Sequence, residues 1–143
     1  MPPDKLIKLI DFYQTLTLES VALFSEFYTK DAYFKDPFNE VRGLPAIQRI
    51  FTHMFSQVAE PRFVIMEQVV DAGGAMLVWE FYFRVHRWGR AEAMILRGVS
   101  HLKFDDTGKV MFHRDYWDTA EELYMKLPVL GTLMRGLRKA FAA

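Results

Sequence analysis

The sequence predicts an α+β fold in which helices pack on one face of an antiparallel sheet. In the first 60 residues apolar side chains recur at helical spacing, and from Arg62 onward they recur at every second residue. Segments rich in turn residues separate the later β-rich runs, so consecutive strands should pair antiparallel. A chain of 143 residues, 51% of them hydrophobic, is long enough to bury one core. We therefore expect a single domain over residues 1–143.

Three helices are predicted before the long strands. The first starts at Pro2 and Pro3, and its apolar face holds Leu6, Leu9, Ile10 and Tyr13. The second follows Thr17, a candidate cap, and its apolar face holds Val21, Phe24, Phe27 and Tyr28. The third follows Gly43 and carries the stripe Ile47, Ile50, Phe51, Met54 and Phe55. A short strand over residues 32–36 precedes it and should end at Pro37, which cannot donate to a ladder.

Four longer strands and a tail helix follow. The strands are the runs "RFVIMEQVV", "AMLVWEFYFRVH", "AEAMILRGVSHLKF" and "KVMFHRDYW", separated by "DAGG", "RWGR" and "DDTG". The tail helix should run from about residue 119 to about residue 140, with an interruption at Pro128. Because one face of the tail is apolar and the other carries Arg135, Arg138 and Lys139, we expect it to pack on its own domain or on a partner subunit rather than on lipid.

The composition argues against several classes of function. The 18 basic and 18 acidic residues cancel, which removes the positive surface expected of a nucleic-acid-binding protein. No segment is apolar for the eighteen or so residues that a membrane span needs, and the N-terminal "MPPDKLIKLIDFYQ" does not resemble a signal peptide, so the expected location is cytoplasmic. The chain has no cysteine, its histidines lack close ligand spacing, and no glycine-rich loop precedes a helix. Neither a metal nor a cofactor is therefore expected.

The stretch "FHRDYWD", residues 112–118, combines chemically active side chains with an alternating pattern. In a strand, alternate residues share a face, so His113, Asp115 and Trp117 should point the same way. The segment is then either a polar patch at a wet sheet edge or the wall of a site. In a site, Trp117 would supply an apolar wall while Asp115 and His113 fix a ligand.

The order of the elements, together with "FKDPF" and the ending "GVSHLKFDDTGKVMFHRDYWD", resembles the nuclear transport factor 2-like fold in its SnoaL-like branch. The resemblance covers nearly the whole chain. It implies a curved antiparallel sheet in the shape of a cone, a cystatin-like α+β barrel, wrapped around N-terminal helices that close a deep apolar pocket. Because this fold hosts enzymes, ligand-binding proteins and interaction domains alike, the function must be argued from the site.

Ketosteroid isomerases, which share this fold, have motifs that can be placed on the chain. Their carboxylate base stands in an aspartate-proline pair, which resembles Asp36 and Pro37, and a tyrosine on their first helix resembles Tyr13. Ser100 stands where they have a protonated aspartate, and its hydroxyl can also donate a hydrogen bond although it is a weaker acid. An Asp-Pro pair is equally an ordinary turn former, and a tyrosine on an apolar helix face is equally an ordinary core residue.

Limonene epoxide hydrolases carry an arginine-aspartate-tyrosine-aromatic-aspartate run on the last strand, which resembles residues 114–118. The resemblance matches Asp115 to a carboxylate that helps to activate water. Their second motif is an arginine and an aspartate two residues apart on an earlier strand. Its nearest equivalent here is Arg84 and His86, so histidine replaces the acid.

The strand over residues 75–86 has one apolar and one mixed set of alternate side chains. Burial places the apolar set against the helices and the pocket, and this set holds Leu77, Trp79, Phe81, Phe83 and Val85. The hydrolase resemblance favours the opposite set, which includes Arg84. We expect Trp79, Phe81 and Phe83 to face inward and retain Arg84 as a candidate site residue.

The expected function is to bind a small hydrophobic molecule, such as a terpenoid, polyketide or steroid-like compound. In an enzyme of acid–base isomerisation or hydrolysis, Asp36 and Asp115 would transfer protons. His113, Tyr13 and Ser100 would orient the substrate or donate hydrogen bonds to it. The candidate pocket residues are Trp117, Ser100, Phe81, Phe83, Trp79, Phe55 and Arg84. The alternative is a non-catalytic ligand-binding or dimeric interaction domain. A homodimer is expected through the outer sheet face, which includes Val78, Tyr82, Val99 and Phe112.

Overall fold

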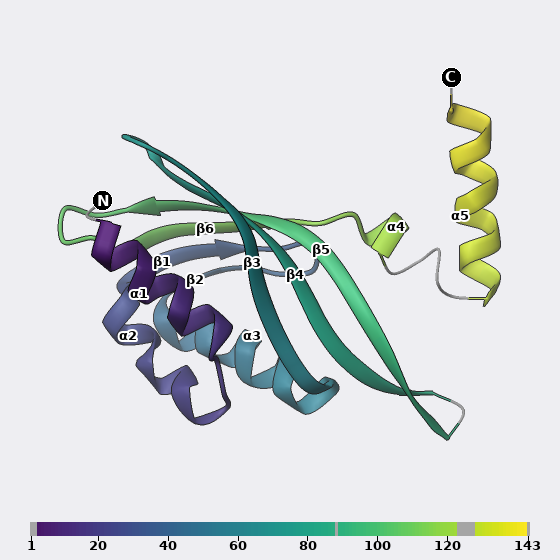
Figure 1. The fold of residues 1–143 in the computed structure, drawn as a ribbon, viewed down its shortest axis with the longest axis horizontal. Helices are drawn as coiled ribbons and strands as arrows, with labels where there is room; N and C mark the ends of the chain where they lie inside the picture. The colour runs from purple at the N-terminus through teal and green to yellow at the C-terminus, as the bar shows by residue number, and fades with distance from the viewer. Residues whose placement is uncertain (1–2, 88, 123–127, 143) are drawn as a thin grey trace.

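A curved sheet with helices on one side makes up most of the protein (Figure 1). The computed structural model describes residues 3–87, 89–122 and 128–142. In chain order these form α1 (Pro3–Gln14), the 3₁₀ helix η1 (Glu19–Leu23), α2 (Phe24–Phe27), β1 (Tyr28–Lys35), β2 (Glu40–Arg42), α3 (Leu44–Gln57), β3 (Ala59–Asp71), β4 (Gly74–Arg87), β5 (Arg90–Phe104), β6 (Val110–Tyr116), α4 (Thr119–Glu122) and α5 (Pro128–Phe141). Figure 1 shows α1, α2 and α3 beneath the sheet and α5 beyond its end. The predicted α+β class is confirmed.

The strands follow the order β2-β1-β6-β5-β4-β3 across the sheet. From β3 to β6 they form the expected antiparallel meander, whereas β1 lies parallel to β6. The short strand β2, which the sequence did not predict, pairs antiparallel with β1. A turn at Asp36 brings the chain back to pair with β1. The Oδ1 atom of Asp36 stabilises this turn by accepting hydrogen bonds from the backbone N–H groups of Phe38 at 2.8 Å and Asn39 at 2.6 Å. With three residues, β2 is too short to show an alternating pattern in the sequence.

The second helix is shorter and less regular than predicted. Thr17 and Ser20 exchange hydrogen bonds between side chain and backbone, as expected of a helix start, but only η1 and the four residues of α2 follow. Tyr28, predicted on the helix, is extended with φ −119° and ψ 148° and pairs with Val110 of β6. Pairing with a distant strand therefore overrides the helical spacing, and it turns the Tyr28 side chain into the core.

The core lies between the concave face of the sheet and α1 to α3. On β4, Trp79, Phe81 and Phe83 are each at most 8% exposed, whereas Met76 is 37% exposed. The inward orientation predicted for the apolar set is confirmed. Gly98 on β5 lies so close to the Trp79 ring that an added Cβ would stand 2.5 Å from it, so glycine at this position allows the indole to lie flat against the sheet.

The described part of the tail holds two helices, and the second begins at Pro128, where the sequence predicts an interruption. Short α4 follows β6, and α5 lies apart from the helices and the sheet (Figure 1). Leu133, Leu137 and Phe141 of α5 are 57%, 45% and 86% exposed, so these three side chains are not buried against their own domain. The expected alternative, packing on a partner subunit, stays a prediction. The side chains of Leu130 and Met134, which also belong to the apolar face of the tail, lie outside the described part. Among the described residues, no helix is long and apolar enough to span a membrane.

Candidate functional site

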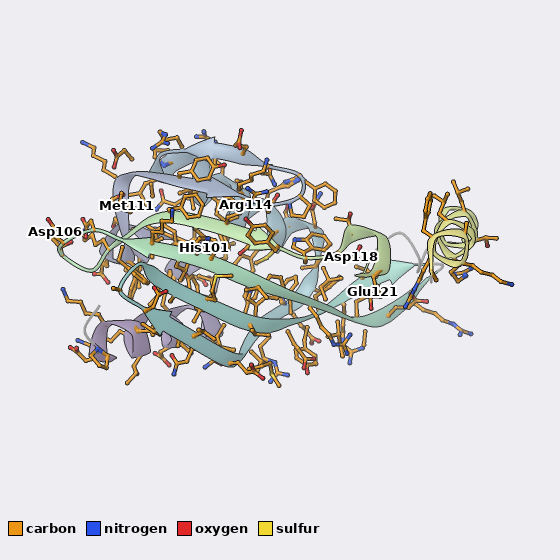
Figure 2. The ribbon with its side chains drawn as sticks, turned by 90° about the horizontal axis from the view of Figure 1, so that it is seen from above. His101, Asp106, Met111, Arg114, Asp118 and Glu121 are labelled. Carbon is orange, nitrogen blue, oxygen red and sulfur yellow. The ribbon has the colours of Figure 1, made fainter. Side chains whose placement is uncertain are left out.

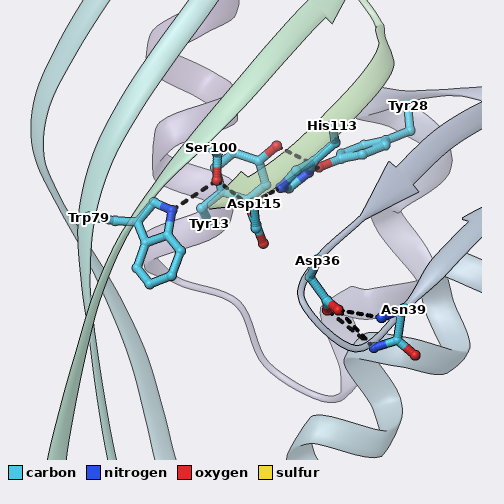
Figure 3. A network of polar contacts seen from close by, with 8 residues as sticks. All are labelled: Tyr13, Tyr28, Asp36, Asn39, Trp79, Ser100, His113 and Asp115. Atoms are coloured by element: carbon cyan, nitrogen blue, oxygen red, sulfur yellow. Dashed lines mark hydrogen bonds and ion pairs between the residues drawn. The ribbon is translucent and has the colours of Figure 1, made fainter. Parts of the chain in front are cut away.

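Six side chains from α1 and four strands meet beneath the centre of the sheet (Figure 3). Strand register brings part of this group together, because Ser100 of β5 stands directly opposite Asp115 of β6. The His113 side chain shares the inward face of β6 with Asp115, as the alternation predicts. We call this group the polar network, which comprises Tyr13, Tyr28, Trp79, Ser100, His113 and Asp115.

The polar network is one continuous chain of hydrogen bonds. On the helix side, the Tyr13 and Tyr28 hydroxyl oxygens are 2.6 Å apart, and the Tyr28 oxygen is 2.6 Å from Nδ1 of His113. Nε2 of His113 is 2.6 Å from Oδ1 of Asp115. On the sheet side, the Ser100 hydroxyl lies 2.5 Å from the same Oδ1 and 2.9 Å from the indole nitrogen of Trp79.

The indole of Trp79 sets the direction of these hydrogen bonds on the sheet side. An indole N–H can only donate, so the Ser100 oxygen accepts from Trp79 and its own hydrogen is directed to Asp115. With Asp115 ionised, a neutral His113 donates through Nε2–H to the same carboxylate oxygen. Its Nδ1 then accepts from Tyr28, which in turn accepts from Tyr13. Donors therefore converge on Oδ1 of Asp115 from both sides.

Burial keeps the two tyrosines in the protonated form that this arrangement needs. Loss of solvation raises the pKa of Tyr13 well above its ordinary value of 10.0, and the nearby Asp115 charge raises it further. Burial is also the largest cause of the raised pKa of Tyr28, followed by the neighbouring Tyr13 hydroxyl. Both phenols thus remain hydrogen-bond donors across the neutral pH range.

Asp115 is the member of the network that presents a carboxylate to open space. Its side chain is 17% exposed, whereas that of His113 is only 4% exposed. Its second oxygen, Oδ2, makes no hydrogen bond to any described residue, and Figure 3 shows it directed toward the space between Trp79 and Asp36. His113 and Ser100 thus hold one oxygen while the other is open to a ligand.

Asp115 borders three neighbouring hollows. The innermost, of about 20 Å³, is also lined by Tyr13, Trp79 and Ser100. The middle cavity, of about 160 Å³, lies between the sheet and α3, and its wall includes the aromatic rings of Phe34, Phe63, Trp79, Phe81 and Trp117. An outer groove of about 410 Å³ is lined by Lys35, Arg114 and Asp118 among others. Asp115 and Trp117 therefore line the same cavity, as their alternation predicts.

Asp36 lines the middle cavity and the outer groove, yet it takes no part in the polar network. Its Oδ1 accepts hydrogen bonds from two backbone N–H groups, and both carboxylate oxygens accept from the side-chain amide of Asn39 at 3.1 and 3.2 Å. The turn role and the ligand-facing position considered for this residue are thus both compatible with the structure.

The remaining predicted residues, Phe83, Phe55 and Arg84, are not among the lining residues of the three hollows. Phe83 is buried next to Phe81 on the inward face of β4. Phe55 is half-buried against the main core. Arg84 is exposed and forms a 2.9 Å ion pair with Glu60, on the opposite face from the cavity.

Tyr28 is the network member that the sequence analysis missed. It had been placed on a helix, although it shares even-numbered alternation with Phe34 and Asp36 in the following strand. That alternation was the available signal. Within the described part of the chain, no three histidine or acidic side chains are grouped so that they could hold a metal ion.

Comparison with known proteins establishes the family. The family model of the SnoaL-like domain matches residues 9–113. The chain belongs to the SnoaL-like family. This membership confirms the resemblance drawn from "FKDPF" and the last two strands.

Solved structures share the fold of this SnoaL-like chain. A putative SnoaL-like polyketide cyclase from Shewanella denitrificans OS-217 is 20% identical, with a TM-score of 0.69 over 85% of this chain and 97% of its own. TsrD from Streptomyces laurentii is 15% identical, with a TM-score of 0.73 over 92% of this chain and 98% of its own. An LEH-like epoxide hydrolase from M. tuberculosis is 15% identical, with a TM-score of 0.65 over 96% and 92% of the two chains. No curated protein matches the chain. At these identities the likeness establishes the fold alone.

Proposed function

We propose that this SnoaL-like protein binds a small apolar molecule in the middle cavity and that Asp115 transfers a proton to or from it. The observation that carries the proposal is a difference between the two oxygens of the Asp115 carboxylate. Oδ1 is held by His113 and Ser100, whereas Oδ2 is directed toward the cavity. A fixed carboxylate with one open oxygen against an aromatic wall is suited to general acid–base chemistry.

The size of the cavity narrows the class of ligand. A designed apolar cavity of about 150 Å³ in another protein binds benzene. The middle cavity, at about 160 Å³ and with its aromatic wall, is therefore suited to one small ring. The rest of a larger ligand would extend past Trp117 into the outer groove, where Lys35 and Arg114 offer positive charge. A small cavity that opens into a groove suits a monocyclic terpenoid or one ring of a polyketide better than a steroid, which the cavity could not enclose completely.

The proton transfer can serve either of two reaction types. In isomerisation, Oδ2 takes a proton from a carbon next to a carbonyl and returns it to another carbon of the same molecule. In hydrolysis of an epoxide, Oδ2 takes a proton from water while the water oxygen attacks a ring carbon. The bond from that carbon to the epoxide oxygen breaks, and the released oxygen takes up a proton from solvent. The epoxide hydrolase of the same fold is named for a reaction of the second kind. In both reaction types, His113 and Ser100 act as positioning residues.

The alternative is a protein that binds its ligand without catalysis. Two observations favour it. Ser100 replaces the protonated carboxylic acid of the isomerase motif, and its hydroxyl is already directed to Asp115. His86, which replaces the acid of the hydrolase motif, is exposed on β4. Either reaction would therefore rely on Asp115 with little help from a second acid.

A one-ring ketone with exchangeable C–H protons tests the proposal directly. The probe is 3-cyclohexen-1-one in deuterated water, with exchange and isomerisation followed by proton NMR. We expect the wild-type protein to accelerate exchange, and Asp115→Asn to lower the accelerated rate by about 100-fold or more while the probe still binds. Equal rates for wild type, Asp115→Asn and buffer, with the probe bound, would instead support the non-catalytic alternative.

We also propose that two copies pair through the outer sheet face, which Figure 2 shows with His101, Met111 and Arg114 labelled. Met76, Met111 and Tyr116 are 37%, 47% and 46% exposed there, which leaves apolar surface for a partner. Sedimentation at tens of micromolar should show a dimer, a concentration of about the order suited to interfaces of ordinary size. A monomer under these conditions would reject this pairing.

A further inference from the structure

The helix α5 carries a stripe of apolar side chains that are exposed by about half or more. Leu133, Leu137 and Phe141 stand four residues apart, so they lie on one side of the helix. They are 57%, 45% and 86% exposed, and Figure 1 shows α5 apart from the sheet and the other helices. Large apolar side chains aligned in this way on an isolated helix need a surface on which to dock.

The charges of α5 are all of one sign. Its sequence, "PVLGTLMRGLRKAF", contains Arg135, Arg138 and Lys139 and no acidic residue. At 100° per residue, Arg135 and Lys139 fall on the side of the helix opposite the apolar stripe, and Arg138 falls on its flank. A basic side opposite an apolar side is the pattern of helices that lie in the plane of a membrane surface.

We propose that α5 binds the surface of anionic lipid bilayers, with its apolar stripe in the acyl-chain boundary and its basic side at the headgroups. Charge favours this occupant over a second copy of the chain. On the outer sheet face, the cations of Arg62, Lys103 and Arg114 lie 4.6 to 4.9 Å above aromatic rings, so a basic helix docked over these three side chains would meet charge of its own sign. The proposal does not depend on the reaction assigned to Asp115.

Two glycines couple folding of α5 to binding. Gly131 and Gly136 lower the intrinsic stability of a helix, so a free helix of 14 residues should be only partly formed. An alanine Cβ at position 136 would meet nothing within 4 Å. Gly136→Ala should therefore strengthen vesicle binding about fivefold by stabilising the helix before it binds.

Flotation of the full chain with vesicles tests the proposal. The vesicles are phosphatidylcholine alone or phosphatidylcholine with about 30% phosphatidylserine, in about 0.1 M salt. We expect binding to the phosphatidylserine vesicles only. Replacing Arg135, Arg138 and Lys139 by glutamine should weaken that binding on the order of 100-fold, since each basic side chain near an anionic surface contributes about fivefold.

A matched variant separates this site from the effect of net charge. Replacement of Lys8, Lys30 and Arg49 by glutamine removes the same charge from exposed positions of the folded domain and should leave vesicle binding unchanged. Equal weakening by the two triple variants would overturn the proposal. So would absence of wild-type binding, or an α5-dependent dimer in sedimentation that forms while vesicles stay unbound, since a second copy would then be the occupant.

Discussion

The polar network and α5 differ in where their polar side chains come from and in how exposed their surroundings are. In the network, side chains from α1, β1, β4, β5 and β6 are buried except for the partly exposed Asp115, and donors converge on a single carboxylate oxygen. Tyr28 and His113, for example, are 85 residues apart in sequence. In α5, one local segment supplies all the charge, and the apolar side chains of Leu133, Leu137 and Phe141 are exposed. Changes in the network should therefore destabilise the whole domain, whereas changes in α5 should alter binding alone.

The largest effect is expected for His113→Phe. The substitution keeps an aromatic ring, slightly larger than imidazole, but leaves the Tyr28 hydroxyl and Oδ1 of Asp115 without their partner in a buried site. We expect the free energy of unfolding to fall by about 3 kcal/mol, because a hydrogen bond to a carboxylate and a second buried bond are both lost. Urea unfolding measures it. A change below about 1 kcal/mol would mean that water replaces the imidazole in the network.

Alkaline pH should weaken the fold through the same network. The folded state holds the phenolic protons of Tyr13 and Tyr28 because their pKa values are raised, while the unfolded chain releases them near the ordinary value of 10.0. Stability is therefore fully present below about pH 10 and falls above it, by up to about 1.4 kcal/mol per pH unit for each tyrosine. Urea unfolding between pH 8 and 11 tests this, and Tyr28→Phe should show a shallower decline. An identical decline in that variant would exclude Tyr28 as a source.

A smaller loss is expected for Tyr28→Phe at neutral pH. The change removes one hydroxyl and leaves the Tyr13 hydroxyl and Nδ1 of His113 unpaired, so the free energy of unfolding should fall by about 2 kcal/mol. Tyr33→Phe is the matched control, because its hydroxyl bonds to Glu40 at the exposed sheet edge. The control should unfold at the wild-type urea concentration. Equal losses of stability in the two variants would mean that the buried Tyr28 hydroxyl contributes no more than the Tyr33 hydroxyl at the surface.

No loss of stability is expected when residues 128–143 are deleted. Since α5 lies apart from the sheet and the other helices, the melting temperature of the truncated protein should match that of the full chain. Vesicle binding should disappear in the same sample. A clear fall in melting temperature would show that α5 stabilises the domain, as the sequence analysis expected.

The fold could be predicted from the sequence because its signals are local. Alternation placed Trp79, Phe81 and Phe83 on the buried side of β4, and the same rule placed His113 and Asp115 on one face of β6. The resemblance to SnoaL-like proteins rested on short motifs near both ends of the matched region, and the family match bears it out.

The polar network could be predicted only in part because it depends on pairing between distant segments. The helical spacing of Phe24, Phe27 and Tyr28 concealed the fact that Tyr28 begins a strand parallel to β6. The contact of Ser100 with Asp115 required the register of β5 against β6, which no single strand encodes. For the tail, the sequence showed the apolar and basic sides of the helix. It did not show which surface the helix contacts.

The most direct test compares the two carboxylates at the cavity. Asp115→Asn and Asp36→Asn remove the same charge from neighbouring walls, but only Asp115 has an oxygen free of hydrogen bonds to described residues. With 3-cyclohexen-1-one in deuterated water, we predict that Asp115→Asn lowers the exchange rate by about 100-fold or more while Asp36→Asn changes it by less than about fivefold. The reverse order, or equal losses in both variants, would contradict the assignment of proton transfer to Asp115.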